Sequence, residues 1–237
     1  MIKKHIDITL ILPCFNEISV FDESVRLIFQ TLLPSNFTYE FLFVDDGSSD
    51  GTRTLIEKVC KKEKLCRFIF HDKNRGRGAA VMTGIHQARG SIVGYMDIDC
   101  EVSPIYIPNC IQLIQEHQAD IVVGKRIYRT SFSSIFREVL SVGYRWIANQ
   151  LLKTGGIDTE SGYKFFNKKK FLPVMKTIQN RHWFWDTESI VRSLRRGLRV
   201  REVPVLFNRR EDKQSSVRIV RDTYLYFIEL FRFVRES

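Results

Sequence analysis

Short apolar stretches rich in β-branched residues alternate with longer stretches of helical periodicity, and this alternation constrains the fold of the 237-residue chain most strongly. In the first half, strands are expected at residues 6–12, 39–44, 66–71, 91–96 and 120–124. Helices are expected at residues 17–33, 52–62, 78–88 and 104–117. We expect Pro13 to end the first strand and Asp50 to cap the second helix. The pattern predicts an α/β fold with a mainly parallel central sheet flanked by helices.

The second half has a less regular pattern. After a helix at 134–153, the sequence predicts a strand at 163–166, helices at 171–178 and 187–196, and a strand at 199–207. Residues 209–216 are polar and have no apolar anchor, so a mobile loop is expected there. Residues 218–235 predict a C-terminal amphipathic helix with interspersed arginines and aromatic residues. No repeat or linker divides the chain, so we expect a single domain over residues 1–237.

The composition limits the partners and the compartment. With 44% hydrophobic residues the chain can bury a core, and its formal net charge of +10 favours an anionic partner. Nucleic acid, a phospholipid surface, a phosphorylated substrate or a merely solvated basic face all fit that charge. Five scattered cysteines fit a reducing compartment rather than a disulfide framework. The first apolar run is too short for a signal peptide, and no stretch of about 18 apolar residues predicts a transmembrane helix, so a cytoplasmic location is expected.

Polar residues gather where three of the expected strands end, at residues 16–17, 45–46 and 97–101. In parallel sheets, ligands bind beyond the carboxyl ends of the strands, so these clusters should converge on one edge. Asp45 and Asp46 can accept hydrogen bonds from a base or a ribose, and the following Gly-Ser-Ser turn leads to a helix N-terminus that favours anions. The alternative is an ordinary Asp-Gly turn.

The segment Asp97-Ile98-Asp99-Cys100-Glu101 carries three carboxylates at alternate positions. In an extended chain they would lie on one side, because side chains alternate with period two. Oxygen ligands at that spacing suit Mg²⁺ or Mn²⁺, which also binds substrate phosphate oxygens and would stabilise a diphosphate leaving group. A solvated acidic turn is the alternative interpretation.

Four first-half motifs together resemble the inverting family 2 glycosyltransferases of the GT-A fold; they are residues 12–17 (LPCFNE), 44–52 (VDDGSSDGT), 74–78 (NRGRG) and 97–99 (DID). In the second half, residues 124–126 (GKR), 158–164 (DTESGYK) and 210–216 are similar to the dolichol-phosphate mannose synthase branch. The resemblance implies a nucleotide-sugar-binding half at residues 1–126, an acceptor half with a loop at 127–217, and the amphipathic helix at 218–237. It also implies a GDP- or UDP-linked hexose donor and a polyprenyl or dolichyl phosphate acceptor.

The resemblance assigns roles to individual residues. The implied nucleotide-sugar-binding residues are Pro13, Phe15, Glu17, Val44, Asp46, Arg77, Asp97, Ile98, Asp99, Arg210 and Ser215. Asp97, Asp99 and Glu101 would hold Mg²⁺ or Mn²⁺, and Asp97, Asp99, Arg210 and Glu160 are the catalytic candidates. Arg126, Arg137 and Ser161 would bind the acceptor. The chain departs from that branch at Glu101, where Gln is usual, and at Lys213 and Ser216, where Gly and Lys are usual, so the donor and the exact branch stay open.

The acceptor decides whether a general base is needed. A lipid phosphate is already anionic and needs cations such as Lys125 and Arg126 to position it. A saccharide hydroxyl, the alternative acceptor, needs a base, and the candidates are Asp158, Glu160, Asp186 and Glu188. The last two could instead be acidic residues that favour a helix N-terminus. The aromatic segment 182–185 is expected to pack, with a platform for sugar or lipid as the alternative.

The C-terminal helix bears on membrane contact. An amphipathic basic helix with aromatic residues can lie in a bilayer interface, which predicts peripheral association with the cytoplasmic face of a membrane. Packing on the domain or on another subunit is the alternative, and a membrane-spanning partner or a homo-oligomer fits as well.

Other function classes fit less well. A nucleic-acid-binding or non-catalytic basic module would place acidic strand ends against a polyanion. Residues 74–78 lack the G-x-G-x-x-G spacing of a dinucleotide-binding oxidoreductase. No Gly-rich phosphate loop follows the first strand, as a sugar-phosphate nucleotidyltransferase would require.

Overall fold

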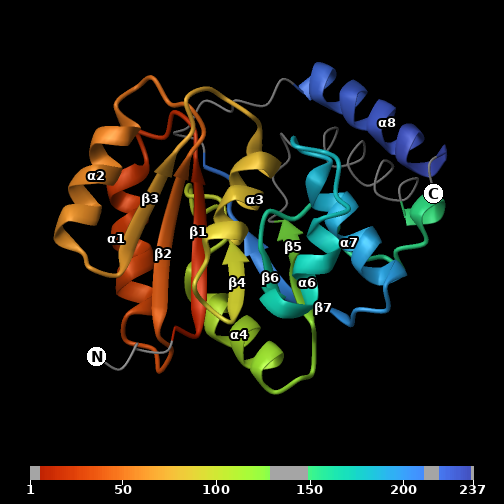
Figure 1. Ribbon diagram of the computed structural model, residues 1–237, viewed down its shortest axis with the longest axis horizontal. Coiled ribbons are helices and arrows are strands. Elements are labelled where there is room, and N and C mark those ends of the chain that lie inside the picture. The colour runs from red at the N-terminus through yellow and green to blue at the C-terminus, as the bar shows by residue number, and fades with distance from the viewer. Residues whose placement is uncertain (1–5, 129–148, 211–218, 236–237) are drawn as a thin grey trace.

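A seven-stranded sheet runs through the middle of the molecule in the order β3-β2-β1-β4-β6-β5-β7 (Figure 1). The computed structural model describes residues 6–128, 149–210 and 219–235. The strands are β1 (Ile8–Cys14), β2 (Tyr39–Asp45), β3 (Cys66–Phe70), β4 (Ile92–Tyr95), β5 (Ile121–Tyr128), β6 (Lys164–Asn167) and β7 (Val200–Phe207). The helices are α1 (Phe21–Leu32), α2 (Thr52–Lys62), α3 (Arg77–Gln87), the 3-10 helix η1 (Pro104–Tyr106), α4 (Ile107–Gln115), α6 (Lys168–Met175), α7 (Trp185–Arg195) and α8 (Ile219–Arg235).

The sheet is mainly parallel, as the alternating pattern predicts. β1 pairs in parallel with β2 and β4, β2 with β3, and β5 with β7. Only β6 runs against its neighbours, β4 and β5, among the strands that the structure describes. Strands from both halves of the chain therefore belong to one sheet, and the carboxyl ends of β1, β2, β4 and β5 reach the same edge.

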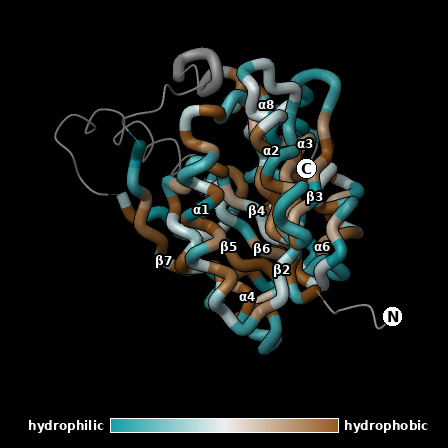
Figure 2. The backbone as a smooth tube through the Cα atoms, turned by 90° about the vertical axis from the view of Figure 1, so that its left-hand side faces the viewer, coloured by the Kyte–Doolittle hydropathy of each residue, from teal (hydrophilic) through white to brown (hydrophobic). Residues whose placement is uncertain are grey.

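Alternating side chains of the strands build a core on each face of the sheet. On one face, Leu10, Leu12 and Phe41 pack against α1, α2 and α4; on the other, Ile11 and Leu42 pack against α3, α6 and α7. In Figure 2 the strands are the brown, apolar segments inside the molecule, while the outer helices carry teal stretches. Two helical layers thus hold the central strands rigid.

Several boundaries differ from the sequence prediction. β1 continues through Pro13, which pairs with Val44. The strand tolerates a residue without an N–H there because β4 pairs with β1 only as far as Ile11. α1 begins at Phe21 rather than at residue 17, because residues 17 and 18 donate their N–H groups to the next loop.

At the start of α2 the N-cap position is occupied by Gly51, not Asp50. Gly51 has a φ of 100°, a left-handed conformation that glycine adopts without strain. Asp50 still accepts a hydrogen bond from Thr52 N at 3.0 Å. β5 is longer than predicted and reaches Tyr128, because β7 pairs with it along its whole length.

The C-terminal helix α8 packs on the domain through part of its surface. Leu230 and Phe233 are buried in a cluster with Phe184, the residue directly before α7. Phe231 and Leu225, by contrast, are 53% and 45% exposed. Of the expected helix at 134–153, residues 149–152 are helical and most of the rest lies outside the described residues. Within the described ranges, no helix combines the length and apolarity needed to cross a membrane.

Candidate active site

The loops that follow β1 and β2 hold each other through side-chain to backbone hydrogen bonds. Asn16 N donates to Ser48 Oγ and Asn16 Oδ1 accepts from Ser49 N, both at 2.9 Å. Glu17 N donates to Thr52 Oγ1, also at 2.9 Å. The first two motifs therefore form one structural unit at the edge of the sheet, as their positions at strand ends predict.

The residues with an implied role at the base and ribose differ in their access to solvent. Phe15 is 37% exposed, and Pro13 and Glu17 are partly exposed. Val44 is fully buried in the core beneath α3, so any contact it makes with a ligand must use its backbone.

Asp46 holds the loop that precedes α3. Its carboxylate accepts hydrogen bonds from Arg75 N at 2.9 Å and from Gly76 N at 2.8 Å, and it pairs with His71 Nδ1 at 2.7 Å. His71 Nε2 in turn lies 3.0 Å from Thr83 Oγ1 of α3. Asp46 thus joins the second motif to the third, and the structure brings together the motifs at residues 44–52 and 74–78.

The acidic segment after β4 is a turn, which corrects the expectation of an extended chain. Cys100 has a φ of 56° and donates its N–H to Asp97 O at 3.3 Å, while Glu101 N donates to Asp99 Oδ1 at 3.3 Å. The positive φ of Cys100 takes the chain out of the extended conformation, while Ile98 stays buried in the core and Cys100 packs against that core. Asp97, Asp99 and Glu101 still lie close enough for their charges to interact.

The pKa values of this segment reflect burial first and the proximity of the carboxylates second. Surrounding protein atoms displace water and raise the pKa of the Asp97 carboxyl; the charge of Asp99 adds to this effect, whereas Arg77 opposes it. Partial burial likewise raises the pKa of Glu101, and Asp99 again adds to the shift. The cluster carries surplus negative charge that a cation would relieve.

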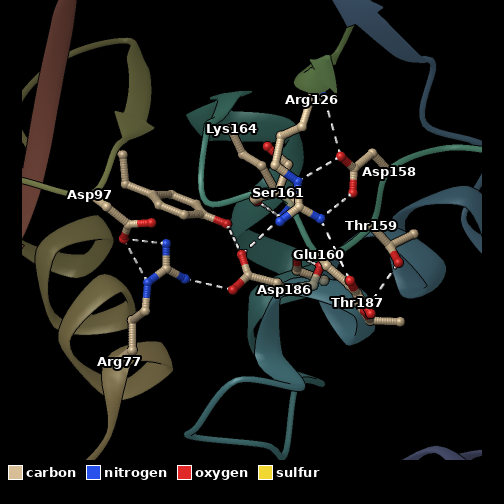
Figure 3. A network of polar contacts seen from close by, with 12 residues as sticks. Arg77, Asp97, Arg126, Asp158, Thr159, Glu160, Ser161, Lys164, Asp186 and Thr187 are labelled. Carbon is tan, nitrogen blue, oxygen red and sulfur yellow. Dashed lines mark hydrogen bonds and ion pairs between the residues drawn. The ribbon is translucent and has the colours of Figure 1, made fainter. Parts of the chain in front are cut away.

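A buried network of charges lies beside the acidic segment (Figure 3). Arg77, the first residue of α3, donates from Nε to Asp97 Oδ1 at 2.8 Å and from Nη1 to Asp186 Oδ2 at 2.5 Å. Asp186 also accepts from Lys164 Nζ at 2.8 Å and from the Tyr95 hydroxyl. Burial lowers the pKa of Lys164, and Asp186 offsets this only in part. Burial acts to lower the pKa of Arg77 too, but Asp186 and Asp97 outweigh it and raise that pKa.

Arg210 reaches the acidic segment from the end of the described part that follows β7. Its backbone N donates to Glu101 Oε1 at 3.1 Å, and its Nη2 donates to Glu23 Oε2 of α1 at 2.6 Å. The structure therefore places a guanidinium beside the acidic cluster, where the resemblance implies a contact with the donor diphosphate.

Arg126, near the end of β5, pairs with a carboxylate rather than facing open solvent. Its Nε and Nη2 each donate to Asp158 at 2.8 Å, and Glu160 Oε2 lies 3.5 Å from Nη2 (Figure 3). Burial acts to raise the pKa of Asp158, but Arg126 outweighs it and leaves that pKa lowered. Ser161 is fully buried, and its Oγ has no hydrogen-bond partner among the described residues.

The four candidate bases differ sharply in their access to an acceptor. Asp186 and Glu188 are each 2% exposed. Glu188 accepts from Gln179 N, Asn180 N and Arg192, so it anchors the loop before α7. Glu160 is the most accessible of the four, with 23% of its side chain exposed.

Three described residues of the site, Lys164, Tyr95 and Glu23, have no role predicted from the sequence. Of these, only Lys164 lies in one of the motifs, as the last residue of 158–164. A lysine inside an otherwise aromatic strand is an unusual pattern that could have marked Lys164, because a buried ammonium needs a counter-ion. Four residues with predicted roles or departures, Arg137, Lys213, Ser215 and Ser216, lie outside the described residues.

The carboxylates of Asp97, Asp99 and Glu101 are chemically suited to a divalent metal, but they are not arranged around a common metal position. All three carboxylates offer hard oxygen ligands of the kind Mg²⁺ and Mn²⁺ prefer. Across residues 6–128, 149–210 and 219–235, no group of three or more His, Cys, Asp or Glu side chains is arranged to hold a metal ion. Arg77 forms an ion pair with Asp97, so a metal would have to compete with that guanidinium for the carboxylate.

Comparison with known proteins gives glycosyltransferases both among protein families and among individual relatives. The family model for glycosyl transferase family 2 matches residues 9–174. Glycosyltransferase AglD of Haloferax volcanii is 28% identical over 222 residues, a match that covers 92% of this chain and 35% of AglD. Dolichyl-phosphate beta-glucosyltransferase ALG5D of Trichomonas vaginalis is 26% identical over 228 residues, which cover 91% of this chain and 70% of that protein. The chain thus spans about a third of the length of AglD.

A solved structure shares the fold. Glucosyl-3-phosphoglycerate synthase from Mycobacterium tuberculosis, in complex with Mn²⁺, uridine diphosphate and glucosyl-3-phosphoglycerate, superposes with a TM-score of 0.69 at 16% identity. The superposition covers 95% of this chain and 77% of that one. The predicted GT-A-type α/β fold with a mainly parallel sheet is confirmed.

Proposed function

The chain belongs to glycosyl transferase family 2, and from this premise we propose that it transfers a hexose from a GDP- or UDP-linked donor to a polyprenyl or dolichyl phosphate, with inversion and with the help of a divalent metal. The observation that carries the proposal is the position of the acidic cluster. Asp97, Asp99 and Glu101 follow β4 at the edge where the loops of β1 and β2 meet, and Arg77 and Arg210 lie against them.

The donor would bind across this edge. Pro13, Phe15, Glu17 and Asp46 would contact the base and ribose, with Val44 contributing its backbone. Asp97, Asp99 and Glu101 would hold Mg²⁺ or Mn²⁺, which when bound supplies Lewis-acid stabilisation of the diphosphate leaving group. The Mn²⁺ and uridine diphosphate bound by the mycobacterial synthase support a divalent metal of this kind.

The cations of the site would stabilise charge on the diphosphate. Arg210 is already within contact of the acidic cluster, and its Glu23 partner is 71% exposed, so the guanidinium can exchange a surface ion pair for a phosphate at small cost. Arg77 lies on the other side of Asp97 and would add a second positive charge. Positioned charges of this kind are the largest expected contribution to the rate.

A phosphate acceptor is supported by the state of the candidate bases. Asp158, Asp186 and Glu188 are all held in ion pairs with buried or half-buried cations. A lipid phosphate needs no base, only cations to position it. Arg126, which would have to leave its ion pair with Asp158, and Arg137 are the candidates, and Ser161 would add a hydroxyl. The name of the Trichomonas vaginalis relative points to the same acceptor class. Glu160, the most accessible carboxylate, is the base that transfer to a saccharide hydroxyl would use.

Membrane contact would be peripheral, on the cytoplasmic face. The exposed side chains Leu225 and Phe231 of α8 offer apolar surface for a bilayer interface. Buried Leu230 and Phe233 would keep the helix docked on the domain at the same time.

A product assay tests the proposal. Labelled GDP-mannose, UDP-glucose and UDP-GlcNAc are each incubated with Mn²⁺ and either a polyprenyl phosphate or a saccharide acceptor. We expect one donor to give a lipid-extractable product that mild acid cleaves. Product on the saccharide alone would contradict the acceptor, and absence of any metal-dependent turnover would contradict the whole proposal.

A further inference from the structure

Asp186 is a buried carboxylate that accepts hydrogen bonds from residues of both the first and the second half of the chain. It is the second residue of α7 and only 2% exposed, so no acceptor molecule reaches its carboxylate. Its Oδ2 accepts from Arg77 Nη1, and its Oδ1 accepts from Lys164 Nζ and from the Tyr95 hydroxyl (Figure 3). Each oxygen already accepts at least one hydrogen bond and the side chain is shielded from solvent, so an electrostatic role fits Asp186 better than proton abstraction.

Arg77 connects Asp186 to the acidic cluster. Its Nε and Nη2 lie 2.8 and 2.7 Å from Asp97 Oδ1, while Nη1 is taken by Asp186. One guanidinium is therefore shared between two carboxylates, 20 and 109 residues away in the sequence. Lys164, which is fully buried, supplies the second positive charge that balances the pair.

The surroundings leave Arg77 little freedom to move. Its guanidinium carbon lies 5.3 Å from the ring centre of Tyr95 and 5.6 Å from that of Trp183. The backbone at Gly162 closes the remaining side: an added Cβ there would lie 2.5 Å from Arg77 Nη2 and would overlap the Asp97 carboxylate. These contacts hold the guanidinium between Asp97 and Asp186, so its charge is divided between the two carboxylates.

We propose that Asp186 is a positioning residue that sets the metal affinity of the acidic cluster by drawing part of the Arg77 charge away from Asp97. The inference rests on the proposed function, because it presupposes that Asp97 binds the metal. A cation and Arg77 compete for Asp97 Oδ1, and the side that wins depends on how strongly Asp186 holds the guanidinium. When Asp186 is neutral, the whole Arg77 charge faces Asp97 and the metal binds more weakly.

Direct titration of the full chain with Mn²⁺ tests this, with free Mn²⁺ followed by electron paramagnetic resonance in the presence of UDP and, separately, GDP. Asp186→Asn is expected to weaken Mn²⁺ binding about tenfold, the range typical of residues that orient metal ligands. Glu188→Gln is the matched control: it removes a carboxylate that is equally buried on the same helix but contacts Arg192 instead of Arg77. Its Mn²⁺ affinity should stay within about twofold of wild type.

Two further variants separate positioning from loss of structure. If Asp186→Asn does not fold, Lys164→Met/Asp186→Asn removes the buried pair together, which leaves no unpaired ammonium, and the same weakening is expected. In an Arg77→Gln background, neutralising Asp186 should change Mn²⁺ affinity by less than about twofold, because the guanidinium that links Asp186 to Asp97 is already absent.

The outcomes are distinct. Wild-type affinity in Asp186→Asn, or a tenfold effect that persists in the Arg77→Gln background, overturns the inference while the proposed function stands. A wild-type chain that binds no Mn²⁺ with either nucleotide overturns the proposed metal dependence, and the inference with it.

Discussion

In the loops after β1 and β2, carboxylates and amides are held mainly by backbone N–H groups of the adjoining loop, as Asp46 is by Arg75 N and Gly76 N. In the segments around β6 and α7, each of the buried carboxylates Asp158, Asp186 and Glu188 also has a cationic side-chain partner, as Asp186 has Lys164 and Arg77. The first arrangement depends on local turns and small residues. The second depends on charges that meet only after the sheet has formed, so the two regions should respond differently to substitution.

Lys164→Met should break the second arrangement most severely. It leaves the buried carboxylate of Asp186 with one cation fewer, and we expect the free energy of unfolding to fall by about 3 kcal/mol in urea denaturation. The double variant Lys164→Met/Asp186→Asn should recover most of that loss. A single variant as stable as wild type would show that the buried pair contributes nothing to folding.

Asp99→Asn should affect function without affecting the fold. The amide retains the Oδ1 acceptor that takes the hydrogen bond from Glu101 N, so the turn is preserved. We expect the transfer rate at saturating donor to fall about a hundredfold because the proposed metal loses a charged ligand. Asp22→Asn, an exposed carboxylate in the first turn of α1, is the control and should keep the wild-type rate.

Asp120→Asn probes ion pairs at the opposite edge of the sheet, away from the site. Hydrogen bonds from Arg199 and Lys170 hold the pKa of Asp120 well below its ordinary value. A lowered folded-state pKa stabilises the protein above the unfolded-state value of about 3.9, and the gain disappears as pH falls through the folded-state pKa. Because both cations are about half exposed, we expect a loss of only about 1 kcal/mol at pH 7.

The pH profile of that variant is the decisive feature. Chemical denaturation is carried out at pH 7 and at pH 3 and below. The difference in the free energy of unfolding between wild type and Asp120→Asn should shrink towards zero as the pH falls. A difference that is independent of pH would contradict the ion-pair account, and a change in transfer rate would contradict the separation of the two edges.

Phe231→Ser should have the smallest effect on stability. The side chain is 53% exposed, so the free energy of unfolding should change by no more than about 0.5 kcal/mol. Sedimentation with anionic vesicles should nevertheless carry down less of the variant than of wild type, if α8 lies in the bilayer interface. Equal sedimentation of the two chains would argue against membrane contact through this face.

The two regions also differ in how far the sequence predicts them. The order and type of the elements, and the polar strand ends at Asp45-Asp46 and Asp97, follow from periodicity and turn residues, because these features act over a few neighbouring positions. Boundaries such as the start of α1 and the end of β5 do not. Pro13 was misjudged, because whether a strand tolerates proline depends on which neighbour pairs with it. The extended chain expected after Asp97 was wrong, because Cys100 adopts a positive φ that the alternation of side chains does not predict.

The buried charge network cannot be predicted from local sequence patterns. Asp186 was weighed only as a base or as a helix-terminal carboxylate, and Arg77 only as a donor contact. Their ion pair joins positions 109 residues apart, and nothing near either residue in the sequence indicates the other. Pairings of this kind are determined by the antiparallel placement of β6 beside β4, which brings Lys164 next to Tyr95.

We place the metal and the diphosphate at the acidic segment after β4. Isothermal titration of UDP and of GDP into wild type and Asp97→Asn, with and without Mn²⁺, tests this directly. In wild type we predict that Mn²⁺ tightens binding of one nucleotide about tenfold, within the usual range of coupling between two ligands. In Asp97→Asn the Mn²⁺-dependent gain should vanish while the metal-independent affinity stays the same. An undiminished Mn²⁺ effect in Asp97→Asn would contradict the account.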